Sequence, residues 1–298
     1  MLSIIFNFDL LLNSINIAAI IILGLVVFIN GPKSKINRIF LLFTSTAVAY
    51  AIINYLSYNT NNPVLILWFL RFVLFSSVWY SFILFHFVYT FSNPNEILPW
   101  PYKYILVPVT TLISIITLST LAFPSIEYVA PIGQVTNPVR GPGMAFFGIA
   151  VMFFVFGSIL LLIDKVFRSK ASERLQFILI LVGTSITYTL IIIFNFILPV
   201  ILNNLTYIPL VPLFSIPFIV FTTYAIIKHH LFNVRVVATE LLIFALWLTL
   251  LIITVRVSTV SDMILHAVVF VATVVLGVFL IRSVLQEVKM REKMTLLA

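Results

Sequence analysis

The sequence predicts an all-α integral membrane protein, a polytopic bundle of nine transmembrane helices arranged as seven plus two. Hydrophobic residues make up 62% of the 298 residues and charged residues only 9%, whereas a soluble domain carries about a quarter charged residues. The apolar residues also form nine long runs, and the cationic residues fall into alternate gaps between them. Each run reaches or approaches the ~20 residues that a helix needs to cross about 30 Å of hydrocarbon, so nine crossings are expected.

Seven of the apolar runs precede residue 230 and two follow it. In order they cover residues 10–29, 39–58, 64–91, 104–122, 144–163, 175–199, 208–227, 237–255 and 263–281. The fourth and seventh runs are the weakest, because proline interrupts both, and Pro217 is expected to kink the seventh helix. If one of these runs lay on the membrane surface, the chain would have seven or eight spans. We expect nine, because removing one span would reverse the side of every later gap and destroy the charge alternation.

The positions of the cations predict the orientation of the chain. Fourteen of the 17 Lys and Arg residues lie in the gaps after the first, third, fifth and seventh runs or in the C-terminal tail. They are Lys33, Lys35, Arg38, Lys103, Lys165, Arg168, Lys170, Arg174, Lys228, Arg235, Arg282, Lys289, Arg291 and Lys293. Cytoplasmic loops retain such cations, so we expect an N-terminus outside and a C-terminus in the cytoplasm. This topology, together with contact between the cations and the anionic headgroups of the bilayer, accounts for the net charge of +8, and no nucleic-acid partner is expected.

Two extramembrane segments stand out. The longest gap, residues 123–143, lies on the predicted outer side and is rich in Pro and Gly, so turns or a short hairpin lid are expected. After the ninth run, the sequence RSVLQEVKMREKMTLLA predicts an amphipathic stalk that continues the last helix into the cytoplasm. Ile281, Leu285 and Val288 fit one heptad seam, which Glu292 interrupts, and they are the candidate signal-transmitting residues of an expected homodimer.

Few polar side chains lie deep within the runs, and they are the candidates for a binding site. Arg71 is the one charged residue well inside a run, and an intramembrane charge suggests function. It has two interpretations: it reaches outward to the external headgroups, or it lines a polar cavity under the outer face. Asn54, Tyr188 and Asn195 are the residues that would share this cavity with Arg71.

The composition gives no indication of a catalytic, cofactor-binding or metal site. The chain has no cysteine, and its four histidines have no metal-ligand spacing, because His229 and His230 are adjacent rather than one helical turn apart. No acidic residue lies deep in a run, which argues against proton-coupled transport and against intramembrane hydrolysis. A phosphate-binding glycine loop is missing as well. We therefore expect a protein that is not an enzyme in itself.

Two stretches resemble a known family. The segment YAIIKHHLFNVRVVATELL, residues 224–242, resembles the junction that closes the N-terminal seven-helix membrane region of bacterial sensor histidine kinases. The third run, with Trp68 and Arg71 followed by Phe85, Phe87 and Phe91, is similar to that family's W-x-x-R and phenylalanine ladder.

The resemblance implies three parts of the chain. Residues 1–230 would form the seven-helix sensor region, residues 231–281 a two-helix hairpin, and residues 282–298 the cytoplasmic start of a signalling helix. Because the family's phosphoacceptor and ATP-binding domains do not follow within this sequence, the chain is expected to be the input half of a two-component sensor kinase.

The leading hypothesis is thus a signal-sensing module of the cytoplasmic membrane. Its expected partners are the lipid bilayer, a second copy of the chain, and an unidentified small apolar ligand or membrane protein. The alternatives are a small-molecule transporter or permease, which the proline-containing seventh run and the polar sixth run favour, and a membrane-anchoring scaffold.

Overall fold

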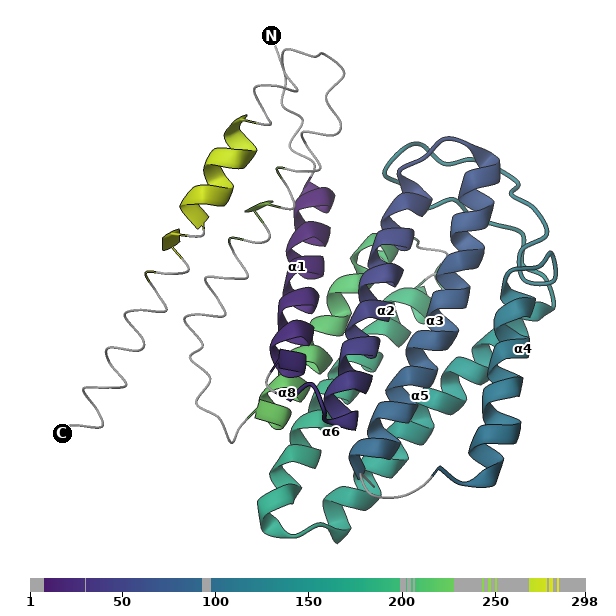
Figure 1. Ribbon diagram of the computed structural model, residues 1–298. Helices are drawn as coiled ribbons and strands as arrows, with labels where there is room; N and C mark the ends of the chain where they lie inside the picture. The colour runs from purple at the N-terminus through teal and green to yellow at the C-terminus, as the bar shows by residue number, and fades with distance from the viewer. Residues whose placement is uncertain are drawn as a thin grey trace. The chain divides into compact units, whose positions relative to one another are not determined.

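The computed structural model describes the helical bundle and part of the C-terminal region. The described residues are 8–29, 31–92, 98–198, 202, 205, 207–227, 243, 246–247, 250, 268–277, 279–280 and 283. Every regular element within them is helical, apart from one antiparallel bridge between Ile126 and Pro138 (Figure 1). Six of the described helices are long and apolar enough to cross a membrane, and two shorter apolar helices accompany them.

The helices follow the seven apolar runs that precede residue 230. They are α1 (Phe8–Ile29), α2 (Lys35–Tyr58), α3 (Pro63–Ser92), η1 with α4 (Tyr102–Leu106 and Val107–Thr117), α5 (Gly143–Arg168), α6 with η2 (Ala171–Ile191 and Ile192–Ile197), and η3 with α8 (Ile208–Ser215 and Ile216–Ile227). The fourth helix is shorter than the run 104–122, because the chain leaves the helix after Thr117 in turns around Ser119. The seventh changes from a 3₁₀ to an α geometry at Ile216, next to Pro217.

The residues divide into two compact units. One unit is Leu23–Ile226, and the other combines Met1–Ile22 with Ile227–Ala298. In the second unit, the described residues around 243–250 and 268–277 contact each other: the indole nitrogen of Trp247 donates a hydrogen bond to the carbonyl oxygen of Thr273 over 3.0 Å. Gly277 faces the same partners, since a Cβ at that position would lie 2.5 Å from the Cγ2 of Ile243. Most of the eighth and ninth apolar runs lies outside the described residues.

Helix α3 is the centre of the Leu23–Ile226 unit, because it packs against α2, α4 and α5. The α6 helix packs on α5, and η3 lies against α2 and α6. Buried phenylalanines join these helices in one half of the bundle. Phe87 of α3 contacts Phe40 of α2 and Phe218 of α8, with ring centroids 5.8 and 6.1 Å apart. Two members of the phenylalanine ladder, Phe87 and Phe91, thus pack against neighbouring helices, and Phe91 reaches Phe177 of α6.

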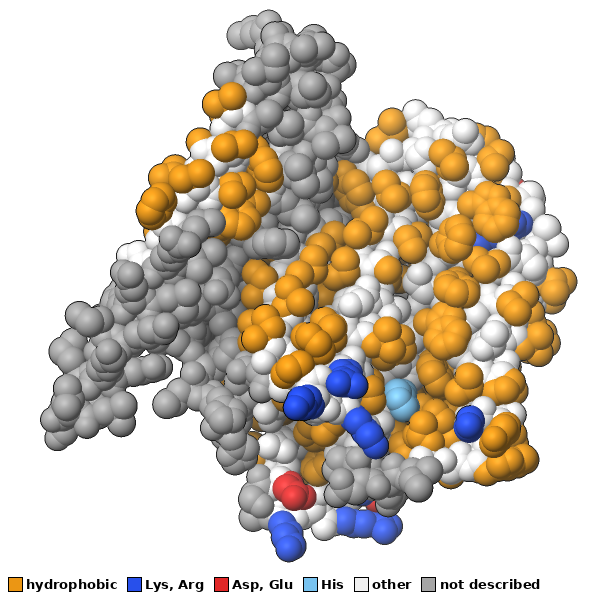
Figure 2. All heavy atoms as spheres, viewed as in Figure 1, with side chains coloured by type: hydrophobic (Ala, Val, Ile, Leu, Met, Phe, Trp, Pro, Cys, Tyr) orange, Lys and Arg blue, Asp and Glu red, His pale blue; other side chains and the backbone are white. Residues whose placement is uncertain are grey.

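The surface of this unit is apolar around its helices and basic at one end. Large hydrophobic side chains are exposed along α2, α3, α4 and α5, and Figure 2 shows them over much of the visible face of the helices. Lys and Arg side chains gather at the end where the α1–α2 and α5–α6 connections lie (Figure 2). An apolar belt of this kind suits hydrocarbon rather than water, so the fold is that of a polytopic membrane helix bundle.

Candidate functional site

Arg71 lies two turns into α3, and its side chain contacts the backbone of Phe123. Its side chain is 6% exposed, and its Nε and Nη2 both donate hydrogen bonds to the carbonyl oxygen of Phe123, over 3.2 and 2.7 Å. The guanidinium also lies 5.3 Å from the centre of the Trp68 ring, within the range of a cation–π contact. The buried charge is therefore compensated by a carbonyl and an aromatic face, and it fixes the start of the loop that follows α4.

That loop, residues 118–142, folds into a hairpin, which we call the outer hairpin. Backbone hydrogen bonds close its base; they run from the amides of Val139, Gly141 and Gly143 to the carbonyls of Ser125, Ala122 and Leu121, respectively. Near its tip, Gly133 adopts a φ of +89° and donates its amide to the carbonyl of Tyr58 at the end of α2, over 2.8 Å. Only glycine takes this φ without steric cost, so the sequence favours the turn that joins the tip to α2.

A cavity of about 490 Å³ lies beneath the outer hairpin, between α2, α3, α5, α6 and η3. Its size falls within the range of small-molecule sites in proteins. The outer hairpin contributes Phe123, residues 135–138 and Arg140 to its wall. The cavity is therefore bounded by the membrane helices and by the one segment that the sequence predicts as an external lid.

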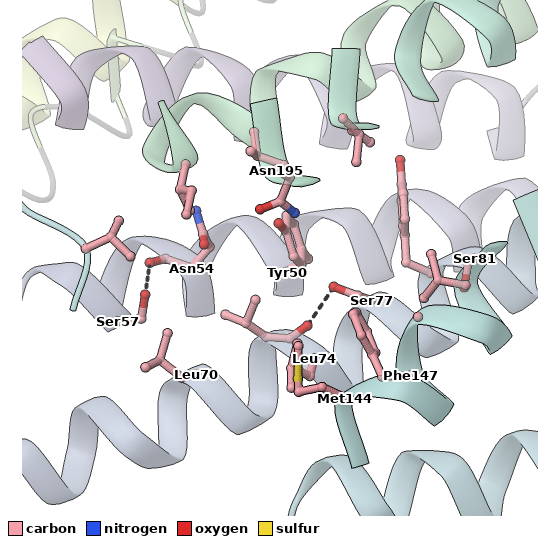
Figure 3. Close-up of a pocket in the computed structure, with 18 of the residues that line it drawn as sticks. Tyr50, Asn54, Ser57, Leu70, Leu74, Ser77, Ser81, Met144, Phe147 and Asn195 are labelled. Carbon is pink, nitrogen blue, oxygen red and sulfur yellow. Dashed lines mark hydrogen bonds between the residues drawn. The ribbon is translucent and has the colours of Figure 1, made fainter. Parts of the chain in front are cut away.

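The walls of the cavity differ in polarity (Figure 3). Figure 3 shows Tyr50 and Asn54 of α2 and Asn195 of η2 on one side, with Leu70 and Leu74 of α3 across from them. Helix α5 contributes further apolar side chains, namely Met144, Phe147, Val151, Met152 and Val155. Met144 and Phe147 are labelled in Figure 3. A bound molecule would thus meet amide and hydroxyl groups on one side and hydrocarbon on the other.

Several polar groups of the walls are satisfied within their own helices. The hydroxyls of Ser57, Ser77 and Ser215 donate to carbonyls three or four residues earlier, over 2.7 to 2.8 Å, as serines in membrane helices often do. Three groups differ: the Nδ2 of Asn54 and the hydroxyls of Tyr80 and Tyr188 are buried without a hydrogen-bond partner among the described residues. The three side chains are 2%, 9% and 5% exposed, respectively. A buried polar group without a partner costs about 1–3 kcal/mol, and a ligand that pairs with it recovers this cost.

The described lining of the cavity carries positive charge and no negative charge. Arg140 is the sole Asp, Glu, Lys or Arg side chain among the described residues that line it. This residue is exposed, and we call the part of the cavity that Arg140 lines its mouth. No group of three or more His, Asp or Glu side chains that could hold a metal occurs within the described parts of the chain. The described lining therefore offers apolar contacts, hydrogen-bonding groups and one positive charge.

The four candidate residues of the polar cavity thus have two different placements. Asn54, Tyr188 and Asn195 line one cavity, whereas Arg71 contacts Phe123 beside it and is absent from its described lining. Sequence reasoning missed Tyr50, which joins Asn54 one turn away on α2; that spacing was the signal that could have identified it. Ile281, Leu285 and Val288 lie outside the described residues.

Comparison with protein families identifies the bundle. Residues 14–235 match the model of the N-terminal 7TM region of histidine kinase, and this match covers the six α1–α6 helices from Ser14 onward together with η3 and α8. The chain belongs to this family, and it is a multi-pass membrane protein that contains the membrane sensor region of a histidine kinase. Comparisons with curated proteins and with solved structures found no match.

Proposed function

We propose that residues 1–298 act as the stimulus-reading part of a two-component sensor, and that the stimulus is a small molecule bound in the cavity under the outer hairpin. The observation that carries this proposal is the group of three buried polar side chains, Asn54, Tyr80 and Tyr188, that lack a hydrogen-bond partner among the described residues and line a cavity of about 490 Å³. Buried polar groups usually have a hydrogen-bond partner, so a group that lacks one calls for an explanation. The family assignment supplies the sensory context.

The proposed topology has nine spans, an external N-terminus and a cytoplasmic C-terminus. The basic end of the bundle supports it, because Lys33, Lys35 and Arg38 share that end with Lys165 and Arg168, and basic connections mark the cytoplasmic side. In this orientation the outer hairpin and the mouth of the cavity face outward. The proposed parts are the sensor region 1–230, the hairpin 231–281 and the stalk 282–298.

Transmission would run through the last helix of a homodimer. Ligand binding can shift the bundle only if the contacts in the cavity differ between two conformations. Ile281, Leu285 and Val288 would then form the seam through which the stalk changes its packing against a second copy. These three residues are assigned from the sequence pattern.

Transport is the competing function, and the composition of the cavity favours sensing. Ion-coupled transporters place ionisable side chains in mid-membrane, whereas the described lining of this cavity contains no carboxylate. Reconstitution in proteoliposomes separates the two, since a transporter would accumulate a solute that binds in the cavity and a sensor would not.

The test of the sensing function is a signalling assay. Residues 1–298 are joined in frame to a histidine kinase core, and autophosphorylation is measured in membranes that carry wild type, Leu285→Asp or Val288→Asp. We expect each substitution to change the basal kinase output several-fold, because a carboxylate in the seam opposes dimer packing. The matched control is Gln286→Asp, which lies outside the seam. Equal output from all four proteins would refute transmission through this helix.

A further inference from the structure

We propose that the cavity takes a neutral or anionic amphiphile, a molecule with an extended apolar body and a hydrogen-bond-accepting head. The inference rests on the proposed function, since it specifies the ligand of the same site. Three independent features of the cavity carry it: the apolar wall, the unpartnered polar groups, and the sign of the charge at the mouth.

The apolar body of the ligand follows from the α3 and α5 side of the cavity. Leu70, Val73 and Leu74 of α3 line the cavity together with methionine and valine side chains of α5, and methionine adapts its shape to flexible hydrocarbon. Little on this wall can solvate a sugar, a nucleotide or a peptide backbone. The serine hydroxyls Ser77 and Ser81 bond to carbonyls of their own helix and are already occupied as donors. Tyr80 is the exception on α3, because its hydroxyl also lines the cavity and is unpartnered among the described residues.

The accepting head follows from Asn54 and Tyr188. The amide Nδ2 of Asn54 is a donor, and the phenolic hydroxyl of Tyr188 can donate as well. Neither has a hydrogen-bond partner among the described residues, and both side chains line the cavity and are more than nine-tenths buried. A carbonyl, ester, hydroxyl or carboxylate oxygen on the ligand would satisfy them, whereas a plain hydrocarbon would leave both unpaired.

The exclusion of cations follows from Arg140. It contributes the single formal charge to the described lining, and no acidic side chain of that lining offsets it. Its guanidinium provides hydrogen-bond donors that match a carboxylate or phosphate group. An ammonium head would meet a like charge at the mouth and no acidic partner below it, so cationic amphiphiles are disfavoured.

The experiment measures binding of four probes that share a twelve-carbon chain. Dodecanoate, methyl dodecanoate, dodecylamine and dodecane compete with the fluorescent fatty acid cis-parinaric acid for the full chain in phosphatidylcholine nanodiscs, and empty nanodiscs correct for partition into lipid. We expect dodecanoate and the ester to displace the reporter at concentrations at least ten-fold lower than dodecylamine or dodecane. Equal competition by all four, or strongest competition by dodecylamine, would overturn the proposal.

Substitutions then place the binding in this cavity. Tyr188→Phe keeps the ring and removes the hydroxyl, and Asn54→Leu keeps the volume and removes the amide; each should weaken dodecanoate binding roughly 3- to 10-fold, the value of one hydrogen bond. The matched controls are Tyr224→Phe on α8 and Thr46→Val on α2, which lie outside the described lining and should leave binding unchanged. Thermal unfolding verifies that each variant is folded. If neither cavity substitution changes the affinity for dodecanoate, the proposed site is wrong.

A further variant tests the charge at the mouth. Dodecanoate should bind the wild type more tightly than methyl dodecanoate, because only its carboxylate can form an ion pair with Arg140. Arg140→Gln should abolish this difference and leave the affinity for the ester unchanged. An unchanged preference would refute the role of Arg140. These assays read binding alone. If the amphiphiles bind but never alter kinase output, the proposed function fails and the ligand class stands. If kinase output responds to a stimulus while no amphiphile binds, the proposed ligand class fails and the sensing function stands.

Discussion

Replacing Arg71 with methionine should release the outer hairpin without unfolding the bundle. The substitution removes two hydrogen bonds to the carbonyl of Phe123 and leaves that carbonyl buried without them. A bond to a charged donor contributes about 1.5–3 kcal/mol, and the two share one acceptor, so we expect a local loss of about 2–3 kcal/mol. Because every 1.4 kcal/mol is a factor of ten, the hairpin should open roughly 30- to 150-fold more often.

Hydrogen exchange measured by mass spectrometry in nanodiscs checks this expectation. Peptides that contain the amides of Val139 and Gly141 should lose protection, because their acceptors lie in the segment that Arg71 holds. Peptides around Phe218, whose amide bonds to the Thr187 hydroxyl over 3.0 Å, should exchange as in wild type. Arg140→Met is the control, since it removes the cation of the outer hairpin but none of the hydrogen bonds at its base. Equal exchange of the hairpin in wild type and Arg71→Met would show that this contact does not anchor it.

Three further predictions concern packing and topology. Gly148→Ala should stabilise the fold by about 0.5–1 kcal/mol, because a Cβ there meets open space. Gly141→Ala should destabilise it by about 1–3 kcal/mol, because the Cβ would overlap the backbone at the base of the outer hairpin. Unfolding in mixed micelles measures both free-energy changes, and equal shifts would contradict the structure. Phe218→Ala should cost about 2–4 kcal/mol in the same assay, since it empties a fully buried aromatic site; a cost below 1 kcal/mol would argue against this packing. The chain has no cysteine, so Gln134→Cys should react with an impermeant maleimide on intact cells and Lys170→Cys only after lysis; the opposite pattern would refute the proposed orientation.

The helices before residue 230 could be predicted from the sequence because each depends on local information. A run of about 20 apolar residues has few alternatives to a helix in hydrocarbon, where every backbone group must be paired within the chain. The run 39–58 thus becomes a helix from Lys35 to Tyr58, with Ser34 accepting from the amide of Asn37 at its start. The end of the fourth helix was harder to predict. The run continues to residue 122, but the Ser119 hydroxyl bonds to the carbonyl of Ile116 and accepts from the amide of Leu121, and this favours a turn.

The candidate site could be predicted only in part, because polar residues within runs are visible in a sequence and their partners are not. Asn54, Tyr188 and Asn195 were candidates because amide and hydroxyl groups are unusual at such depth, and they line one cavity. The partner of Arg71 is a backbone carbonyl 52 residues away, and a carbonyl is present at every position, so no residue type marks it. The contribution of the outer hairpin to the cavity wall likewise depends on how its tip docks on Tyr58.

The position of α3 explains how a ligand under the outer hairpin could influence the opposite end of the bundle. Leu74 of this helix lies in the cavity wall, and Arg71, one turn earlier, holds the hairpin. Further along, Phe87 and Phe91 pack against α2, α6 and α8. Close-packed interfaces between helices resist continuous deformation and shift between discrete arrangements. A ligand that moves α3 by repositioning Leu74 would therefore alter the packing of these phenylalanines, whereas a ligand that contacted only the hairpin would leave them unchanged.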